Sequence, residues 1–129
     1  MSFYQKEIVV SKEDLDDLNH VNNVRYVQWI QDISKEHWVE KAPNNIQEKV
    51  IWVVMTHHIE YKSAAVFNDS ILLKTHIKES SGAKCTRVVE MYNSITNSLL
   101  VRSNTEWCLL NRRSLRPIRI SEEIKEIFS

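Results

Sequence analysis

Glycine is almost missing from this chain of 129 residues, which contains only Gly82. An average protein has roughly 7% glycine. A P-loop and a Rossmann fingerprint each need two or more glycines, and the nucleophile elbow of serine hydrolases needs the pattern GxSxG. The sequence therefore excludes phosphate sites of these two kinds. For the same reason Ser63, Ser80 and Ser81 are not candidates for a serine-hydrolase nucleophile.

Cysteine and long apolar runs are scarce as well. Cys85 and Cys108 form no CxxC pair and suggest no disulfide framework, so we interpret both as reduced core thiols. No stretch reaches the ~18 apolar residues of a membrane span, and the start MSFYQKEIVV does not resemble a secretory signal. These absences predict a cytoplasmic protein with no membrane partner.

An excess of charge of either sign is also missing. The chain has 17 Lys and Arg residues against 17 Asp and Glu residues, so its formal net charge is zero. This balance favours neither nucleic acid nor an anionic membrane as a partner. With 43% hydrophobic residues the chain can build one core, and we expect a single domain over residues 1–129.

Apolar residues at helical spacing predict one long helix from residue 24 to about residue 41. The stripe consists of Tyr26, Trp29, Ile30, Ile33 and Trp38. Asn22 is a suitable N-cap, and Val21 before it can staple onto Tyr26. Pro43 disfavours helical geometry at the residue before it, Ala42, so the helix is expected to end near this position.

Runs of β-branched and aromatic residues predict strands, with residues 11–22 as an ordered loop after the first. The expected strands are residues 3–10, 50–61, 70–77, 85–92 and 99–110. The connections at 68–69, 80–82 and 93–97 are too short for βαβ crossovers, so the sheet should be antiparallel. Ser121 predicts a short capped helix over 121–128.

A five-stranded sheet has two faces, and one helix covers only one of them. The continuous apolar run VIWVVM at residues 50–55 indicates a strand buried on both sides. Either a second copy of the chain or a partner must therefore cover what the helix leaves bare, and we expect a homodimer.

The segment 14–26 concentrates polar chemistry just before the long helix. It contains three carboxylates (Asp14, Asp16 and Asp17), His20 and several carboxamides. A helix N-terminus offers free N–H groups and a positive dipole end that stabilise an oxyanion, so a carboxylate there is a candidate nucleophile or general base. The alternative is that these aspartates are solvated loop residues and that the asparagines only cap the helix.

The string DLDDLNHVNNVRYVQWI resembles the segment that opens the central helix in hotdog-fold thioesterases of the 4-hydroxybenzoyl-CoA thioesterase family. Its HVNNVRY part is similar to plant and bacterial acyl-ACP thioesterases, and HHIEYKSAAVFND resembles the family's strand and turn. The resemblance implies an α+β hotdog fold, with an antiparallel five-stranded sheet wrapped around one long helix. It also implies hydrolysis of an acyl-CoA or acyl-ACP thioester, no metal or redox cofactor, and a homodimer or homotetramer.

The resemblance assigns three site residues. Asp16 matches the family's catalytic aspartate, ten residues before Tyr26, and attacks the thioester carbonyl or activates water. The main-chain N–H of Asn23 matches the donor to the thioester oxygen, and His20 matches a histidine that positions or deprotonates water. Two positions depart from the pattern: Leu18 stands where acyl-ACP thioesterases have an asparagine, and Asn19 replaces a common glycine.

Other residues support weaker hypotheses. His57 and His58 are adjacent on a predicted strand and point to opposite faces, so we expect no metal site. Glu60 is expected in a surface salt bridge, although relatives place an acidic helper nearby. The helix stripe is expected in the core, with part of it lining an acyl pocket as the alternative.

Two rival functions share the fold. A hotdog hydratase or dehydratase needs a histidine five residues after its aspartate, and none of the three aspartates has one. A non-catalytic acyl-thioester-binding module differs from an enzyme by binding ligand without turnover.

Overall fold

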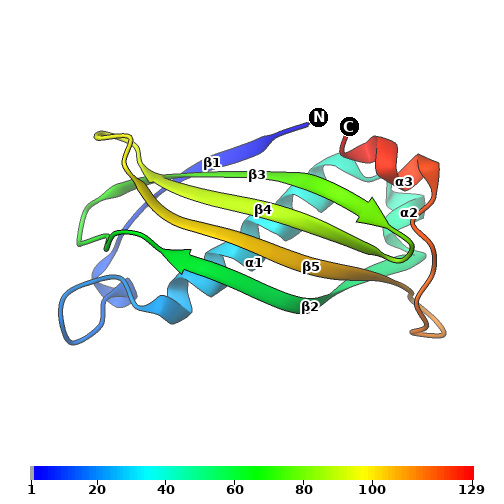
Figure 1. Cartoon of the computed structure of the whole chain (residues 1–129), viewed down its shortest axis with the longest axis horizontal. Coiled ribbons are helices and arrows are strands. Elements are labelled where there is room, and N and C mark those ends of the chain that lie inside the picture. The colour runs from blue at the N-terminus through cyan, green and yellow to red at the C-terminus, as the bar shows by residue number, and fades with distance from the viewer. Residues whose placement is uncertain (1) are drawn as a thin grey trace.

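The computed structural model describes residues 2–129 and contains the expected order of one strand, one long helix, four strands and a short helix (Figure 1). The strands are β1 (Tyr4–Val9), β2 (Val50–Tyr61), β3 (Ser70–Ser81), β4 (Lys84–Asn93) and β5 (Leu99–Asn111). The helices are α1 (Asn23–Lys41), α2 (Asn44–Gln47) and α3 (Glu122–Ile127), with a 3-10 turn η1 at Lys12–Asp14. The short elements η1 and α2 were not predicted.

The strands form one antiparallel sheet in the order β1-β3-β4-β5-β2, which confirms the predicted sheet. The turn between β3 and β4 is tighter than expected, because β3 extends to Ser81 and only Gly82 and Ala83 connect the strands. Gly82 has a φ of +63° there, which glycine adopts without steric cost. The segment between β2 and β3 is no hairpin, because these strands are not neighbours in the sheet.

The long helix begins and ends for the predicted reasons. The Asn22 side chain accepts a hydrogen bond from the Val24 N–H at 3.0 Å, so Asn22 is the N-cap. At the other end, Ala42 is already extended in front of Pro43. None of the helices within residues 2–129 is long and apolar enough to cross a membrane.

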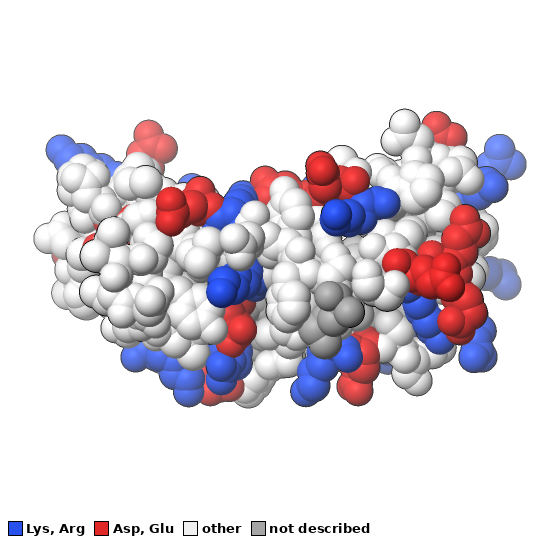
Figure 2. Space-filling model, turned by 90° about the horizontal axis from the view of Figure 1, so that it is seen from above, with Lys and Arg blue, Asp and Glu red and all other residues white. Residues whose placement is uncertain are grey.

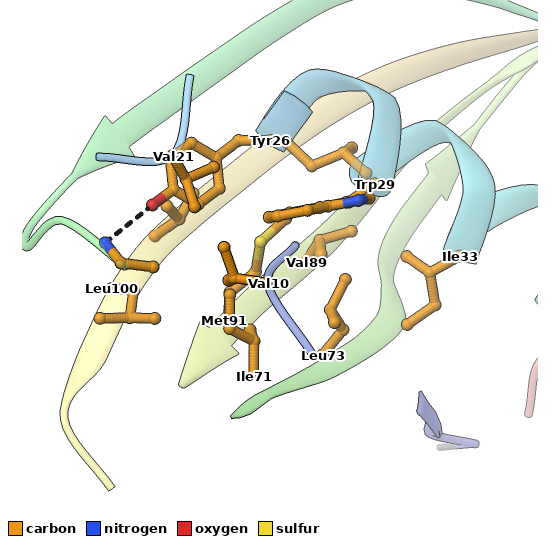
Figure 3. Packing of buried hydrophobic residues seen from close by; sticks show 13 residues of the cluster. Val10, Val21, Tyr26, Trp29, Ile33, Ile71, Leu73, Val89, Met91 and Leu100 are labelled. Atoms are coloured by element: carbon orange, nitrogen blue, oxygen red, sulfur yellow. Dashed lines mark hydrogen bonds between the residues drawn. The ribbon is translucent and has the colours of Figure 1, made fainter. Parts of the chain in front are cut away.

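The sheet curves around α1, and the helix stripe packs into its concave face (Figures 1 and 3). Buried residues of the helix meet buried residues of β3, β4 and β5 in one cluster: Tyr26, Trp29, Ile30, Ile33, Ile71, Leu73, Val89, Met91 and Val101. A second cluster joins Trp38 to α3 and the strand ends near it. The expectation that the stripe forms core is confirmed.

The surface carries both signs of charge. Figure 2 shows acidic and basic side chains interspersed over the face seen from above. On the convex side of the sheet, Arg102 pairs with Glu90 at 2.8 Å and Lys84 lies 3.7 Å from Glu106. Cys85 and Cys108 are both free and buried, as predicted for core thiols.

Candidate active site

The loop between β1 and α1 is anchored by a buried carboxylate, Asp14, which is only 4% exposed. Its Oδ2 accepts hydrogen bonds from the N–H (2.9 Å) and the hydroxyl (3.1 Å) of Ser11, and its Oδ1 accepts one from Arg25 Nε at 2.8 Å. The Asp14 main-chain oxygen accepts from the Asn22 N–H at 2.8 Å. The alternative of a solvated loop residue is therefore wrong for Asp14, because its oxygens are fully used inside the protein.

A turn after β2 braces the same loop from the other side. The Val21 N–H donates to the Ala65 oxygen at 2.9 Å, and the Ala65 N–H donates to the Tyr26 hydroxyl at 3.2 Å, the dashed line in Figure 3. Burial raises the pKa of Tyr26, so this phenol stays neutral. The strand-and-turn segment that carries the resemblance thus holds the segment with the candidate aspartate in place.

Asp16 lies at the start of a small closed loop, residues 16–20, and is partly exposed. Its N–H donates to the His20 oxygen at 2.8 Å, and Asn19 closes the turn with a φ of 61°, the left-handed geometry that asparagine tolerates. Oδ1 accepts from the N–H groups of Leu18 (2.9 Å) and His20 (3.2 Å). Oδ2 accepts no hydrogen bond from residues 2–129, so one carboxylate oxygen is oriented and the other is free to react.

The N-terminus of α1 presents a free donor. Asn23 is the first helical residue, and its main-chain N–H has no acceptor in the described part of the chain. Its neighbours are engaged, since Val24 N–H and Arg25 N–H both bond to Asn22. A free N–H at the positive end of a 19-residue helix can stabilise a developing oxyanion.

The other polar residues of the segment have different roles. The His20 side chain is exposed and makes no hydrogen bond within residues 2–129, although its main chain closes the loop around Asp16. Leu18 is 74% exposed and contributes to Asp16 through its N–H alone. Asp17 is exposed. The structure thus bonds the Asp16 carboxylate to two main-chain N–H groups, and the free N–H of Asn23 follows seven residues later, at the start of α1.

The remaining candidates lie on β2. His57 points to the inner face, where its Nδ1 is 2.9 Å from Thr105 Oγ1, and His58 lies on the next position of β2, 3.9 Å from Glu60. Burial lowers the pKa of His57. Glu60 pairs with Lys62 at 2.7 Å, the expected surface salt bridge, and this lysine lowers the pKa of Glu60. No cluster of three or more metal-ligating side chains occurs in the described residues.

A cavity near the other end of α1 was not predicted. It has a volume of about 430 Å³ and is bordered by Trp38 of the helix stripe and by Trp52, Trp107, Arg87 and Phe128. One residue of the stripe, Trp38, therefore borders this cavity, whereas Trp29, Ile30 and Ile33 lie in the core.

Comparison with known proteins identifies the family to which this chain belongs. Residues 2–128 match the acyl-ACP thioesterase N-terminal domain family. An acyl-[acyl-carrier-protein] hydrolase, FATB3 of Cuphea viscosissima chloroplasts, is 23% identical over 86 residues, or 67% of this chain. The match spans about a fifth of that protein's length, 21%.

Solved structures show the same fold at low identity. A 4-hydroxybenzoyl-CoA thioesterase variant in complex with 4-hydroxybenzoyl-CoA superimposes over 100% of both chains, with a TM-score of 0.89 at 13% identity. YbaW, a probable thioesterase from Escherichia coli, has a TM-score of 0.85 at 17% identity, covering 95% of this chain and 94% of its own. The chain therefore has the hotdog fold and belongs to the acyl-ACP thioesterase N-terminal domain family.

Proposed function

We propose that the protein hydrolyses an acyl-CoA or acyl-ACP thioester to a free carboxylic acid and a thiol. One observation carries this proposal: Asp16 keeps a free carboxylate oxygen in the same braced segment in which Asn23 presents a free main-chain N–H. Family membership supports the reaction type, because the thioester is the bond that acyl-ACP thioesterases cleave.

In the proposed reaction the thioester oxygen accepts a hydrogen bond from the Asn23 N–H, which makes the carbonyl carbon more electrophilic. Asp16 either removes a proton from water, whose oxygen then adds to that carbon, or adds directly and forms an anhydride that water cleaves. In both routes the negative charge gathers on the carbonyl oxygen, near the positive end of α1. The carbon–sulfur bond then breaks, and the thiolate leaves and takes up a proton. In the water route this step gives the acid, whereas in the direct route it gives the anhydride, which water then cleaves into the acid and free Asp16. His20 contributes a secondary polar group near the water.

We propose that the active unit is a homodimer or homotetramer in the cytoplasm, with no cofactor. Strand β2 is an edge strand of the sheet, and its Met55 is 51% exposed beside an irregularity in the pairing. An edge with free main-chain groups and apolar side chains favours pairing with a second copy. The buried free thiols of Cys85 and Cys108 fit a reducing compartment. Acyl-chain release in fatty acid metabolism is the role that the family resemblance favours.

Thiol release from a panel of acyl-CoA and acyl-ACP esters, short to long aliphatic plus one aromatic, tests the reaction. We expect Asp16→Asn to lower kcat by orders of magnitude. A single turnover in water labelled with heavy oxygen tests the direct route: label in the Asp16 carboxylate would establish it, because such label arises only when water cleaves the anhydride at the Asp16 carbon.

The role of the Asn23 N–H has a sharper test, since proline has no N–H but fits the first position of a helix. The preceding residue, Asn22, already has φ −64° and ψ 135°, the geometry that a following proline requires. We expect Asn23→Pro to fold normally and lose at least ~10²-fold in kcat, the usual cost of removing one oxyanion donor. Asn23→Ala keeps the N–H and should remain active. Folded wild type that binds thioesters without cleaving any of them would refute hydrolysis and favour a binding module.

A further inference from the structure

The cavity beside Trp38 lies far from the proposed reaction centre. It lies between the C-terminal half of α1 and the sheet, where residues of β2, β3, β4 and β5 border it. His37, next to Trp38, is about four helical turns beyond Asn23, which corresponds to roughly 20 Å along the axis. The cavity has a volume of about 430 Å³, which is within the usual range of small-molecule sites.

Arg87 of β4 borders this cavity and is a buried cation without a counter-ion. It is 4% exposed, and no Asp or Glu pairs with it in residues 2–129. Its Nη1 donates to His37 Nδ1 at 2.9 Å and to Thr75 Oγ1 at 3.0 Å, both neutral acceptors. Its Nε and Nη2 have no acceptor among the same residues. Burial lowers the pKa of Arg87 to about 10, so the guanidinium is charged at neutral pH.

The surroundings of Arg87 have hydrogen-bond donors in excess. Because His37 Nδ1 accepts from Arg87, the ring proton of His37 is on Nε2, and this N–H is buried without an acceptor. The indole N–H groups of Trp52 and Trp107 are also buried without acceptors. Burial and Arg87 lower the pKa of His37 to about 4, so this ring is neutral at pH 7.

The rest of the lining is mostly apolar, with three neutral polar side chains, Gln31, Ser34 and Gln47. Trp38, Trp52, Trp107 and Phe128 supply aromatic surface, and the Phe128 ring lies 5.2 Å from the Arg87 guanidinium carbon. Lys35 and Arg112 also border the cavity, and no acidic residue does. A buried charge is costly unless an opposite charge compensates it, and here the protein supplies none.

We propose that this cavity binds a carboxylate carried on an apolar body, with Arg87 as the anion-binding residue and the aromatic walls holding the body. Two sources supply this chemistry. One is the free acid that thioester hydrolysis releases, and the other is an acyl group with a second carboxylate at its far end. Both of these ligands presuppose the proposed thioesterase function, whereas the binding of a carboxylate in the cavity does not depend on it.

Binding measurements test the site without reference to turnover. Decanoate and 1-naphthoate are titrated against their primary amides by calorimetry and by the fluorescence of the cavity tryptophans. We expect wild type to bind each carboxylate at least ten-fold more tightly than its amide. Arg87→Met should abolish that preference and leave amide binding unchanged, and the matched control Arg102→Met, on the convex face, should retain it.

The competing explanation is that Arg87 only packs against Phe128 and joins the strands. Equal affinity of wild type for acid and amide would overturn the proposal and needs no variant to be folded. The unliganded stability of Arg87→Met gives a second readout. We expect it to match or exceed that of wild type, since removing an uncompensated buried charge is favourable. A large loss of stability together with equal binding would assign Arg87 to packing alone.

Kinetics then separate the two sources. If the site holds the far end of the acyl group, wild type prefers an ω-carboxyl acyl-CoA over the methyl-terminated ester of equal length, and Arg87→Met reverses that kcat/KM ratio. If the site holds the released acid, Arg87→Met raises the inhibition constant of added acid, whereas the control Arg102→Met keeps the wild-type value. Absence of all turnover in folded wild type would refute the proposed hydrolysis, while the binding titration alone decides the carboxylate site.

Discussion

Replacing Asp14 by alanine should destabilise the protein, whereas replacing Asp16, two residues away, should abolish activity and leave stability almost unchanged. Asp14 is the buried carboxylate of the loop and accepts three side-chain or main-chain hydrogen bonds, from the Ser11 N–H, the Ser11 hydroxyl and Arg25. Asp16 is partly exposed and accepts two local main-chain bonds at one oxygen. The same residue type thus has two different roles in one loop.

The magnitude follows from the partners of Asp14. A hydrogen bond to a charged group contributes about 1.5–3 kcal/mol to the free energy of unfolding. Because Ser11 is exposed, water can accept from its N–H and hydroxyl in the variant, which reduces the loss from these two bonds. The Arg25 side chain is 43% exposed, so this ion pair contributes at most about 1 kcal/mol. We expect Asp14→Ala to lower the free energy of unfolding by about 3 kcal/mol, or roughly 10 °C in Tm for a chain of this size.

Urea and thermal unfolding, followed by circular dichroism at one fixed protein concentration, measure this change. Asp17→Ala is the matched control, because Asp17 is exposed and makes no side-chain hydrogen bond or ion pair within residues 2–129, so its effect should stay within about 0.5 kcal/mol. A loss below about 1 kcal/mol for Asp14→Ala would refute the view that this carboxylate holds the loop. So would an Asp16→Asn variant that unfolds as readily as Asp14→Ala.

Three further predictions concern other parts of the chain. Asn22→Ala removes the N-cap of α1 and should cost about 1 kcal/mol in chemical unfolding, with Asn22→Ser close to wild type. His37 has a pKa of about 4 in the folded protein against 6.5 in the unfolded chain, so between these values the unfolded state binds more protons. The free energy of unfolding should therefore be highest above pH 6.5 and fall by about 3 kcal/mol toward pH 4. His37→Gln should flatten that part of the pH profile. Burial raises the pKa of Cys85 to about 11, so this thiol, which borders the cavity, should react with a disulfide reagent far more slowly at neutral pH than after unfolding. Rapid labelling of Cys85 in the native protein would contradict this.

The elements that local patterns determine were predictable from the sequence. The helical stripe, the N-cap Asn22 and the strand runs each depend on residues within a few positions of one another, and the structure has these elements with ends shifted by a few residues. The end of β3 was placed too early, because the two-residue turn at Gly82 depends on the pairing with β4. The turn η1 lies inside the predicted loop and exists because the Asp14 side chain bonds back to Ser11.

The features that depend on distant residues were not predictable. The burial of Asp14 depends on Arg25, eleven positions away, and on packing against the rest of the chain, so the spacing of the three aspartates could not separate it from Asp17. In the sequence, nothing distinguishes Arg87 from the other basic residues of the chain. Its burial depends on α1, β3 and α3 meeting around it through His37, Thr75 and Phe128, and no local pattern records that meeting.

The departure at position 18 has a physical explanation in the loop geometry. Leu15 packs on the core and bridges to Val21, so the chain between them must turn back within residues 16–20. In that turn the N–H of residue 18 points at the Asp16 carboxylate, whatever its side chain, and the Leu18 side chain itself extends into solvent. Orientation of the carboxylate therefore depends on main-chain donors that survive the replacement of asparagine by leucine. What the leucine removes is a side-chain amide beside this carboxylate. In the proposed mechanism Leu18 therefore bears on how Asp16 would activate a nucleophile, and not on whether Asp16 is held in place.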